Sequence, residues 1–155
     1  MNLFKIKTKG FTLIEVLLVI AILALLAAIV IIAINPAKQL AKTRDTQRAS
    51  DIYSILNAIH QYAVDHDGAL PEELTTDDLE ICKTVNTSCF GLLDLSVLTD
   101  EEAYIVSVPQ DPRCPYDSAY CSENGTGYYA VLTDGGRVNV YAPSAEIEDE
   151  ISVTQ

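Results

Sequence analysis

The residues with the clearest chemical potential are Gly10, Phe11 and Glu15, which lie at the start of a long apolar run. Residues 11–34 comprise 24 positions, of which 17 are Leu, Ile, Val or Phe and five are Ala, so that only Thr12 and Glu15 are polar. As a helix, the run would be about 36 Å long, which exceeds the roughly 30 Å hydrocarbon core of a bilayer. The sequence therefore predicts a transmembrane helix with one carboxylate inside it.

Glu15 is costly in such a helix and needs a positively charged partner. The apolar residues favour insertion by roughly 5–10 kcal/mol, against about 3 kcal/mol for one acidic residue, so the segment still inserts. Three lysines within residues 1–10 precede the run and would lie at the aqueous face. A cut after Gly10 would remove these lysines and create an amine on Phe11, four positions before Glu15.

Residues 9–15, Lys-Gly-Phe-Thr-Leu-Ile-Glu, resemble the processing site of the type IV pilin and type II secretion pseudopilin superfamily. The resemblance implies that residues 1–10 are a basic leader, which a prepilin peptidase removes by cutting between Gly10 and Phe11. It also implies N-methylation of Phe11 and an assembly contact between the new N-terminus and Glu15. The alternatives are a plain single-pass anchor and a secretory signal peptide, although the apolar region of a signal peptide is usually only about 7–15 residues long.

The function implied by this resemblance is that of a structural subunit of a type IV pilus-like filament. A type II secretion pseudopilin or a minor pilin is the alternative within the family, and a membrane-anchored binding domain that never polymerises is the alternative outside it. The implied partners are further copies of the chain, the prepilin peptidase with its N-methyltransferase activity, and an assembly ATPase with its inner-membrane platform. The chain would lie in the cell membrane before assembly and in a surface filament afterwards, with no cofactor.

The charge of the chain limits its other partners. The 155 residues carry a net charge of −12, and residues 66–155 contain 18 acidic residues against Lys83, Arg113 and Arg137. Such a surface repels nucleic-acid phosphates, so no direct binding of nucleic acid is expected. The lysines before the apolar run favour an N-terminus inside and a head outside. No phosphate-binding loop, nucleophile elbow or zinc-protease motif is found in the sequence, so we expect no enzymatic activity.

The four cysteines suggest two short disulfide loops in an exterior head. Cys82 and Cys89 have the same spacing as Cys114 and Cys121, and pairing within each local pair is the simplest of three possible connectivities. Each small loop would stabilise the head by about 2–3 kcal/mol in the chain-entropy model. A zinc site is disfavoured because the close Cys-x2-4-Cys spacing is lacking. Unpaired thiols remain open.

Beyond the apolar run, the sequence predicts a second helix and then a small head. Pro36 should interrupt the helix, because proline lacks an amide donor and disfavours a helical residue before it. Residues 37–65 contain no Gly or Pro, and one apolar face recurs at spacings of three and four. The expected segments are residues 35–66 as an amphipathic helix and 67–155 as an acidic globular head. The apolar face consists of Ile52, Ile55, Leu56, Ile59 and Ala63, and the preceding turns are polar, with Lys42, Arg44, Asp45, Gln47, Arg48 and Asp51.

Within the head, the clearest signal is Asp134-Gly135 between two β-prone runs, residues 128–133 and 136–141. Asp-Gly in this setting predicts a tight β-hairpin, with Val138 and Val140 on one face. Residues 69–103 are expected to form loops and short helical turns, and 104–108 a strand or an extended connector. The expected fold class is α+β, a long N-terminal helix packed on a small antiparallel sheet.

Two weaker candidate sites involve metal ligands. Some pseudopilin heads bind calcium, and Asp111, Asp117, Glu123 and Asn124 are suitable oxygen ligands, but their spacing matches no fixed pattern. We therefore predict no metal site and interpret these residues as exposed turn positions. His60 and His66 lie six positions apart, which does not align them on one helical face, so neither is expected to bind a metal or catalyse a reaction.

Overall fold

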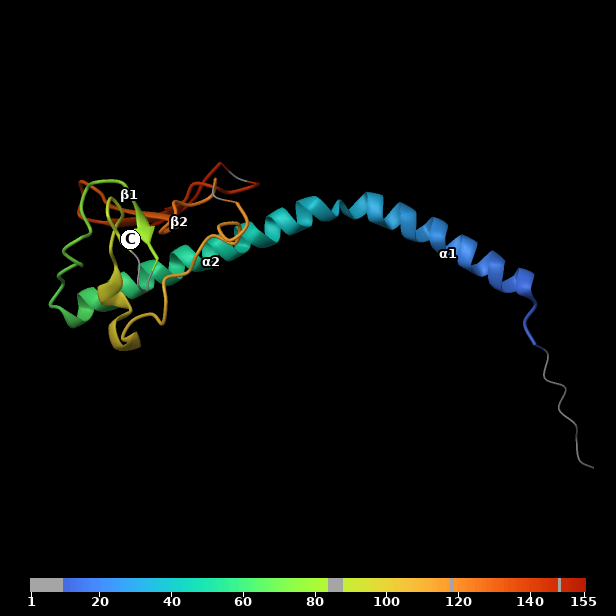
Figure 1. Ribbon diagram of the computed structural model, residues 1–155, viewed down its shortest axis with the longest axis horizontal. Helices are drawn as coiled ribbons and strands as arrows, with labels where there is room; N and C mark the ends of the chain where they lie inside the picture. Colours follow the sequence, from blue (N-terminus) through green and yellow to red (C-terminus); the bar gives the residue numbers. More distant parts are fainter. Residues whose placement is uncertain (1–9, 84–87, 118, 148) are drawn as a thin grey trace, which may run out of the picture. The chain divides into compact units, whose positions relative to one another are not determined.

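A computed structural model describes residues 10–83, 88–117, 119–147 and 149–155. The chain divides into two compact units, Met1–Gln39 and Leu40–Gln155. The first contains helix α1, Leu13–Ile34, and the first turn of helix α2, Pro36–Asp65. The second contains the rest of α2 and the head (Figure 1).

Helix α1 is apolar on every side and none of its residues is buried. It is long and apolar enough to cross a membrane by its length and composition. A helix with no polar face must be covered by lipid or by other apolar helices, because the hydrophobic effect disfavours such a surface in water.

The interruption expected at Asn35-Pro36 is present, and Asn35 both ends α1 and caps the start of α2. Its backbone is left-handed (φ 47°, ψ 79°), which ends α1. Its side-chain oxygen then accepts a hydrogen bond from the Lys38 amide at 3.3 Å, which caps the start of α2. Pro36 occupies the first position of α2, where its missing N–H costs nothing.

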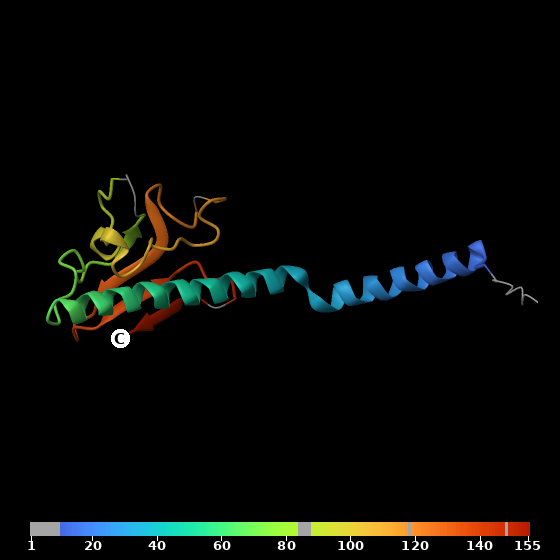
Figure 2. The same cartoon turned by 90° about the horizontal axis from the view of Figure 1, so that it is seen from below.

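The head sheet is fully antiparallel, in the order β1-β2-β3-β4. Its strands are β1 Leu79–Cys82, β2 Gly125–Leu132, β3 Val138–Ala142 and β4 Ile151–Thr154. Seen from below in Figure 2, α2 runs along the sheet. The α+β class expected from the sequence, a long apolar helix and a second helix packed on a small antiparallel sheet, is therefore correct.

The core lies between α2 and the sheet. Helix α2 contributes Ile52, Ile55, Leu56 and Ile59, all at most 1% exposed. Burying a side chain of this size stabilises the fold by about 1.5–3 kcal/mol. Ala63, expected on the same face, is only partly buried because it lies near the end of the helix. The sheet and the loops complete this core with Tyr128, Ala130, Val138, Val140, Ala142, Ile81, Leu93, Leu95 and Leu98.

The predicted hairpin is the β2–β3 pair, and its inward face is the predicted one. Val138 and Val140 are at most 1% exposed, whereas Tyr141, which alternates with them along β3, is only partly buried. The turn is a three-residue loop closed by a hydrogen bond from the Thr133 amide to the Arg137 carbonyl at 2.8 Å. Gly136 supplies the left-handed residue (φ 74°) that such a loop needs.

Two strands were not predicted. Residues 69–103 were expected to lack strands, yet they contain β1, whose Glu80, Ile81 and Cys82 are all at most 4% exposed. A four-residue strand that is buried on both faces has no alternating pattern to reveal it. Strand β4 at the C-terminus also forms only through pairing with β3. Residues 104–108 form no strand, and bends at residues 104, 106 and 107 make the connector irregular, so the expected strand is absent.

Candidate processing and assembly site

The peptide bond between Gly10 and Phe11 lies just outside the first turn of α1. Gly10 belongs to no helix or strand, and Phe11 is 82% exposed. A Cβ atom added at Gly10 would meet no atom within 4 Å. The described part of the fold therefore gives no steric reason for glycine at this position.

Thr12 determines where α1 begins. Its backbone is extended (φ −81°, ψ 152°), and its hydroxyl accepts a hydrogen bond from the Glu15 amide at 3.3 Å. Its carbonyl accepts the first helical bond, from the Val16 amide at 3.3 Å. Threonine followed three positions later by glutamate is the capping-box spacing, in which each residue can satisfy one amide at the helix start. This local signal was available in the sequence, but Thr12 was not identified there as a cap.

Phe11 and Glu15 lie beside one another at this helix start. Together with Val16, Val19 and Ile20 they line a hollow of about 250 Å³. Phe11 precedes the cap and Val16 is the fourth helical residue, the two positions that pack together in a hydrophobic staple. An amine on Phe11 would therefore form beside the Glu15 carboxylate, in surroundings that are otherwise apolar.

The head contains a second polar site that the sequence did not reveal. Arg48 of α2 is completely buried and makes two hydrogen bonds to Asp111, from Nε at 2.6 Å and from Nη2 at 3.1 Å. The expectation that Asp111 is an exposed turn residue is wrong, because Asp111 is also completely buried. Arg48 belongs to the polar part of α2 that the sequence indicated, but nothing in the sequence predicted its burial.

Four more charged side chains extend this ion-pair network. Arg48 Nη1 contacts Asp45 at 2.7 Å and Glu146 at 3.1 Å, and Arg44 forms a short bidentate pair with Glu146. Arg113 lies 3.9 Å from Glu146, so three arginines face three carboxylates. Asp45 also accepts the amides of Glu146 and Ile147 at 2.8–3.1 Å. The network thereby fastens the loop between β3 and β4 to α2.

The pKa values follow from these contacts. The hydrogen bond from Arg44, reinforced by Arg48, lowers the pKa of Glu146 from 4.5 to about 2. Burial alone would lower the pKa of Arg48, but its hydrogen bonds to Asp111, Asp45 and Glu146 outweigh burial and raise it. These shifts favour the charged forms of both Arg48 and Glu146, as an ion pair requires.

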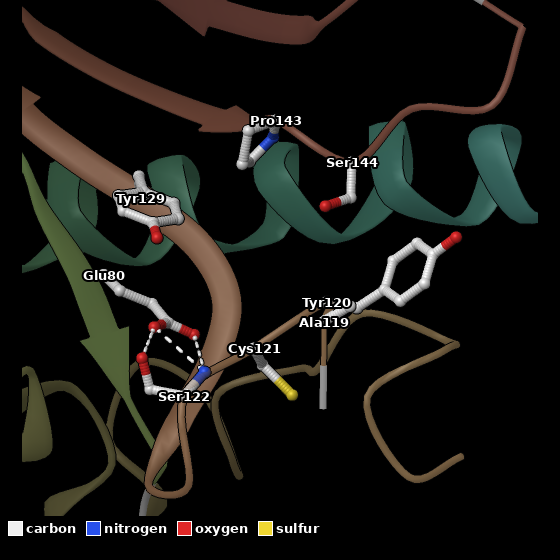
Figure 3. A pocket seen from close by; sticks show the side chains of 8 residues that line it. All are labelled: Glu80, Ala119, Tyr120, Cys121, Ser122, Tyr129, Pro143 and Ser144. Atoms are coloured by element: carbon white, nitrogen blue, oxygen red, sulfur yellow. Dashed lines mark hydrogen bonds between the residues drawn. The ribbon is translucent and has the colours of Figure 1, made fainter. Parts of the chain in front are cut away.

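A hollow of about 330 Å³ in the head is lined by Glu80 and Tyr129, among others (Figure 3). Glu80 is 4% exposed and accepts hydrogen bonds from the Ser122 amide at 3.1 Å, from the Gly127 amide at 2.8 Å and from the Ser122 hydroxyl. Its carboxylate is thus satisfied by the protein, and it joins β1 to the segment that follows Cys121. This arrangement supports a structural role for Glu80.

The cysteines are joined as Cys82–Cys89 and Cys114–Cys121, each with Cα atoms 5.6 Å apart. These are the two local pairs that the spacing favoured, which supports the predicted disulfides. The first loop is tied to the segment that follows the second, because the Lys83 amide donates to the Asn124 carbonyl at 2.8 Å.

The remaining candidates do not converge into a metal site. Asp111 is engaged by Arg48, and Asp117 lies 3.7 Å from Arg113. Within the described ranges, no group of three or more His, Cys, Asp or Glu side chains is placed to hold a metal ion. His66 stacks on Tyr62 with ring centroids 3.9 Å apart, and neither His66 nor His60 belongs to such a group.

The fold and the N-terminal motif together define a class of protein: a pilin-like subunit whose apolar helix follows a prepilin-type junction and whose second helix packs on a small antiparallel sheet. The prokaryotic N-terminal methylation motif matches residues 5–34. The chain is also 30% identical over 149 residues to the type II secretion system core protein G of Escherichia coli (strain K12), covering 96% of this chain and 90% of that protein. The chain belongs to the type IV pilin and type II secretion pseudopilin superfamily.

A second family pattern, described as lipopolysaccharide-assembly, LptC-related, matches residues 20–108. That match starts after Glu15 and ends before β2, so it includes neither residues 10–15 nor the last three strands. The similarity to core protein G extends over 96% of the chain and therefore carries the family assignment. No solved structure matches the chain significantly.

Proposed function

We propose that this chain is a structural subunit of a pilin-like filament, cut between Gly10 and Phe11 and polymerised through α1. The observation that carries the proposal is a carboxylate, Glu15, in the first turn of a 22-residue apolar helix with no buried residue. Such a helix needs a cover of lipid before assembly and of other helices afterwards.

Processing changes the electrostatics of the helix start. The uncut chain has no cation beside Glu15 among the described residues, since the first described lysine is Lys38. Cleavage creates an ammonium group on Phe11, and N-methylation preserves its charge. An ion pair between this group and Glu15, in the same subunit or in the next, offsets a desolvation cost of several kcal/mol for the buried carboxylate. Subunits then exchange lipid contacts for contacts between α1 helices.

A second candidate, within the same class, is a subunit of a type II secretion pseudopilus rather than of a long pilus. The observation that favours it is the similarity to core protein G, which covers nearly the whole chain. The two candidates differ in readout, because a pseudopilin variant would impair protein secretion while leaving long surface fibres unaffected. A filament-defective pilin variant would do the reverse.

The test compares Glu15→Ala with Val16→Ala, the adjacent apolar position, in the native host. We expect both variants to insert and to be cut, which N-terminal sequencing and intact mass would report as chains beginning at methylated Phe11. Recovery of sheared or cross-linked filaments should fall at least tenfold for Glu15→Ala and stay near the wild-type level for Val16→Ala. Equal filament recovery from the two variants would refute the assembly role of Glu15. A wild-type chain that stays uncut in the membrane and yields no filament would favour a non-polymerising anchored domain.

A further inference from the structure

Positive charge is concentrated in the segment that directly follows the apolar helix. Residues 35–44 contain Lys38, Lys42 and Arg44 and no acidic residue. Residues 66–155 carry 18 acidic residues against three basic ones, so the head is strongly negative. The chain thus has one short cationic stretch between an apolar helix and an acidic head.

Two of these three cations are free of protein partners. Arg44 is held by Glu146, whereas the side chains of Lys38 and Lys42 are exposed and make no hydrogen bond or ion pair with any residue that the structure describes. The two lysines lie four positions apart on α2, and this spacing places them on the same side of the helix. No described side chain competes for this lysine pair.

The lysine pair lies close to the end of the apolar helix along the chain. Lys38 and Lys42 follow the end of α1 at Ile34 by four and eight residues, beyond the break at Asn35. The headgroup layer adds about 5–7 Å on each side of the hydrocarbon core. Lysine side chains are long enough to reach back toward this layer while their stems cover apolar surface.

We propose that Lys38 and Lys42 bind anionic phospholipid headgroups while α1 spans the membrane. The phosphodiester anions supply the negative charge that the lysine pair lacks within the chain, and an anionic membrane surface repels the acidic head. The lysine pair therefore favours the membrane-bound subunit in anionic lipid and opposes its withdrawal. The proposal rests on α1 spanning a bilayer and does not depend on polymerisation.

The test uses the full chain reconstituted in phosphatidylcholine vesicles that contain about 30% phosphatidylglycerol. Electron paramagnetic resonance measures the relative association of spin-labelled phosphatidylglycerol and spin-labelled phosphatidylcholine with the protein. Charge near such a surface contributes about 1 kcal/mol per lysine, which is roughly fivefold in association. At low salt, we expect the ratio of phosphatidylglycerol to phosphatidylcholine association to fall at least fivefold in the Lys38→Gln/Lys42→Gln variant.

Arg137→Gln is the matched control, because Arg137 is an exposed cation in the hairpin turn, remote in sequence from the apolar helix. It should retain the wild-type preference, and 0.5 M NaCl should weaken the preference of the wild-type chain through screening. The lysines of the leader are common to all variants, so differences between variants report on the lysine pair alone.

Two results would overturn the proposal. One is an unchanged lipid preference in the double glutamine variant. The other is a set of cross-links between copies, formed in vesicles of phosphatidylcholine alone and lost in that variant, which would place the lysine pair against a second copy of the chain. A failed filament assay with an intact lysine-dependent lipid preference would refute only the proposed function.

Discussion

Removing the cation at the centre of the buried network should destabilise the head more than any surface change. Arg48→Met keeps a long apolar stem but leaves three carboxylates, of Asp45, Asp111 and Glu146, facing one another without the central guanidinium. Their side chains are 11%, 0% and 16% exposed, so water cannot replace the lost partner fully. Breaking a buried ion pair by removing one member typically costs about 3–5 kcal/mol.

That loss would be a large fraction of the stability of a typical domain, which is about 5–15 kcal/mol. For a head of this size, it corresponds to a drop in Tm of roughly 10–20 °C. The assay is thermal and urea unfolding of the full chain in detergent, followed by near-ultraviolet circular dichroism. This signal comes from the packed tyrosines of the head, because the apolar helix contains no tyrosine or tryptophan.

The control and a double variant make the prediction specific. Arg44→Met removes a partly exposed member, 30% exposed, and should cost about 1 kcal/mol or less. In Arg48→Met/Asp111→Leu the uncompensated Asp111 carboxylate is also gone. The double variant should therefore lose less unfolding free energy than the two single variants lose together. A loss below about 1 kcal/mol for Arg48→Met, or strict additivity in the double variant, would refute the view that Arg48 neutralises a buried anion.

Two further predictions concern packing and pH. Gly125→Ala should destabilise the head by about 1–3 kcal/mol in urea unfolding, because the new Cβ would lie 2.0 Å from Glu80 Oε1. The control is Gly135→Ala, whose Cβ has its nearest neighbour at 3.9 Å and whose stability should stay within about 0.5 kcal/mol of wild type. Equal effects of the two substitutions would contradict the close approach at Glu80. Because the pKa of Glu146 is lowered from 4.5 to about 2, its contribution to stability is present above pH 4.5 and is lost as the pH falls toward 2. The urea midpoints of wild type and Glu146→Gln should therefore converge between pH 5 and about pH 2, and a constant difference would count against this ion pair.

Much of the molecule could be predicted from local sequence. The apolar helix follows from composition alone, since 22 of residues 11–34 are apolar. The break at Pro36 and the β2–β3 hairpin follow from residues whose backbone preferences are strong and short-ranged. Gly10, Phe11 and Glu15 were found for the same reason, because they lie within six consecutive positions. Thr12 was available to the same reasoning through its spacing to Glu15.

The tertiary structure decided which charged residues are buried and which strands complete the sheet. Arg48 and Asp111 are 63 positions apart, and nothing near either residue distinguishes it from a solvated charge. Strands β1 and β4 are four residues each and depend on pairing with β2 and β3. Helix caps, turns and apolar runs are decided by neighbours in the sequence, whereas ion pairs and strand edges are decided by partners that only folding brings within reach.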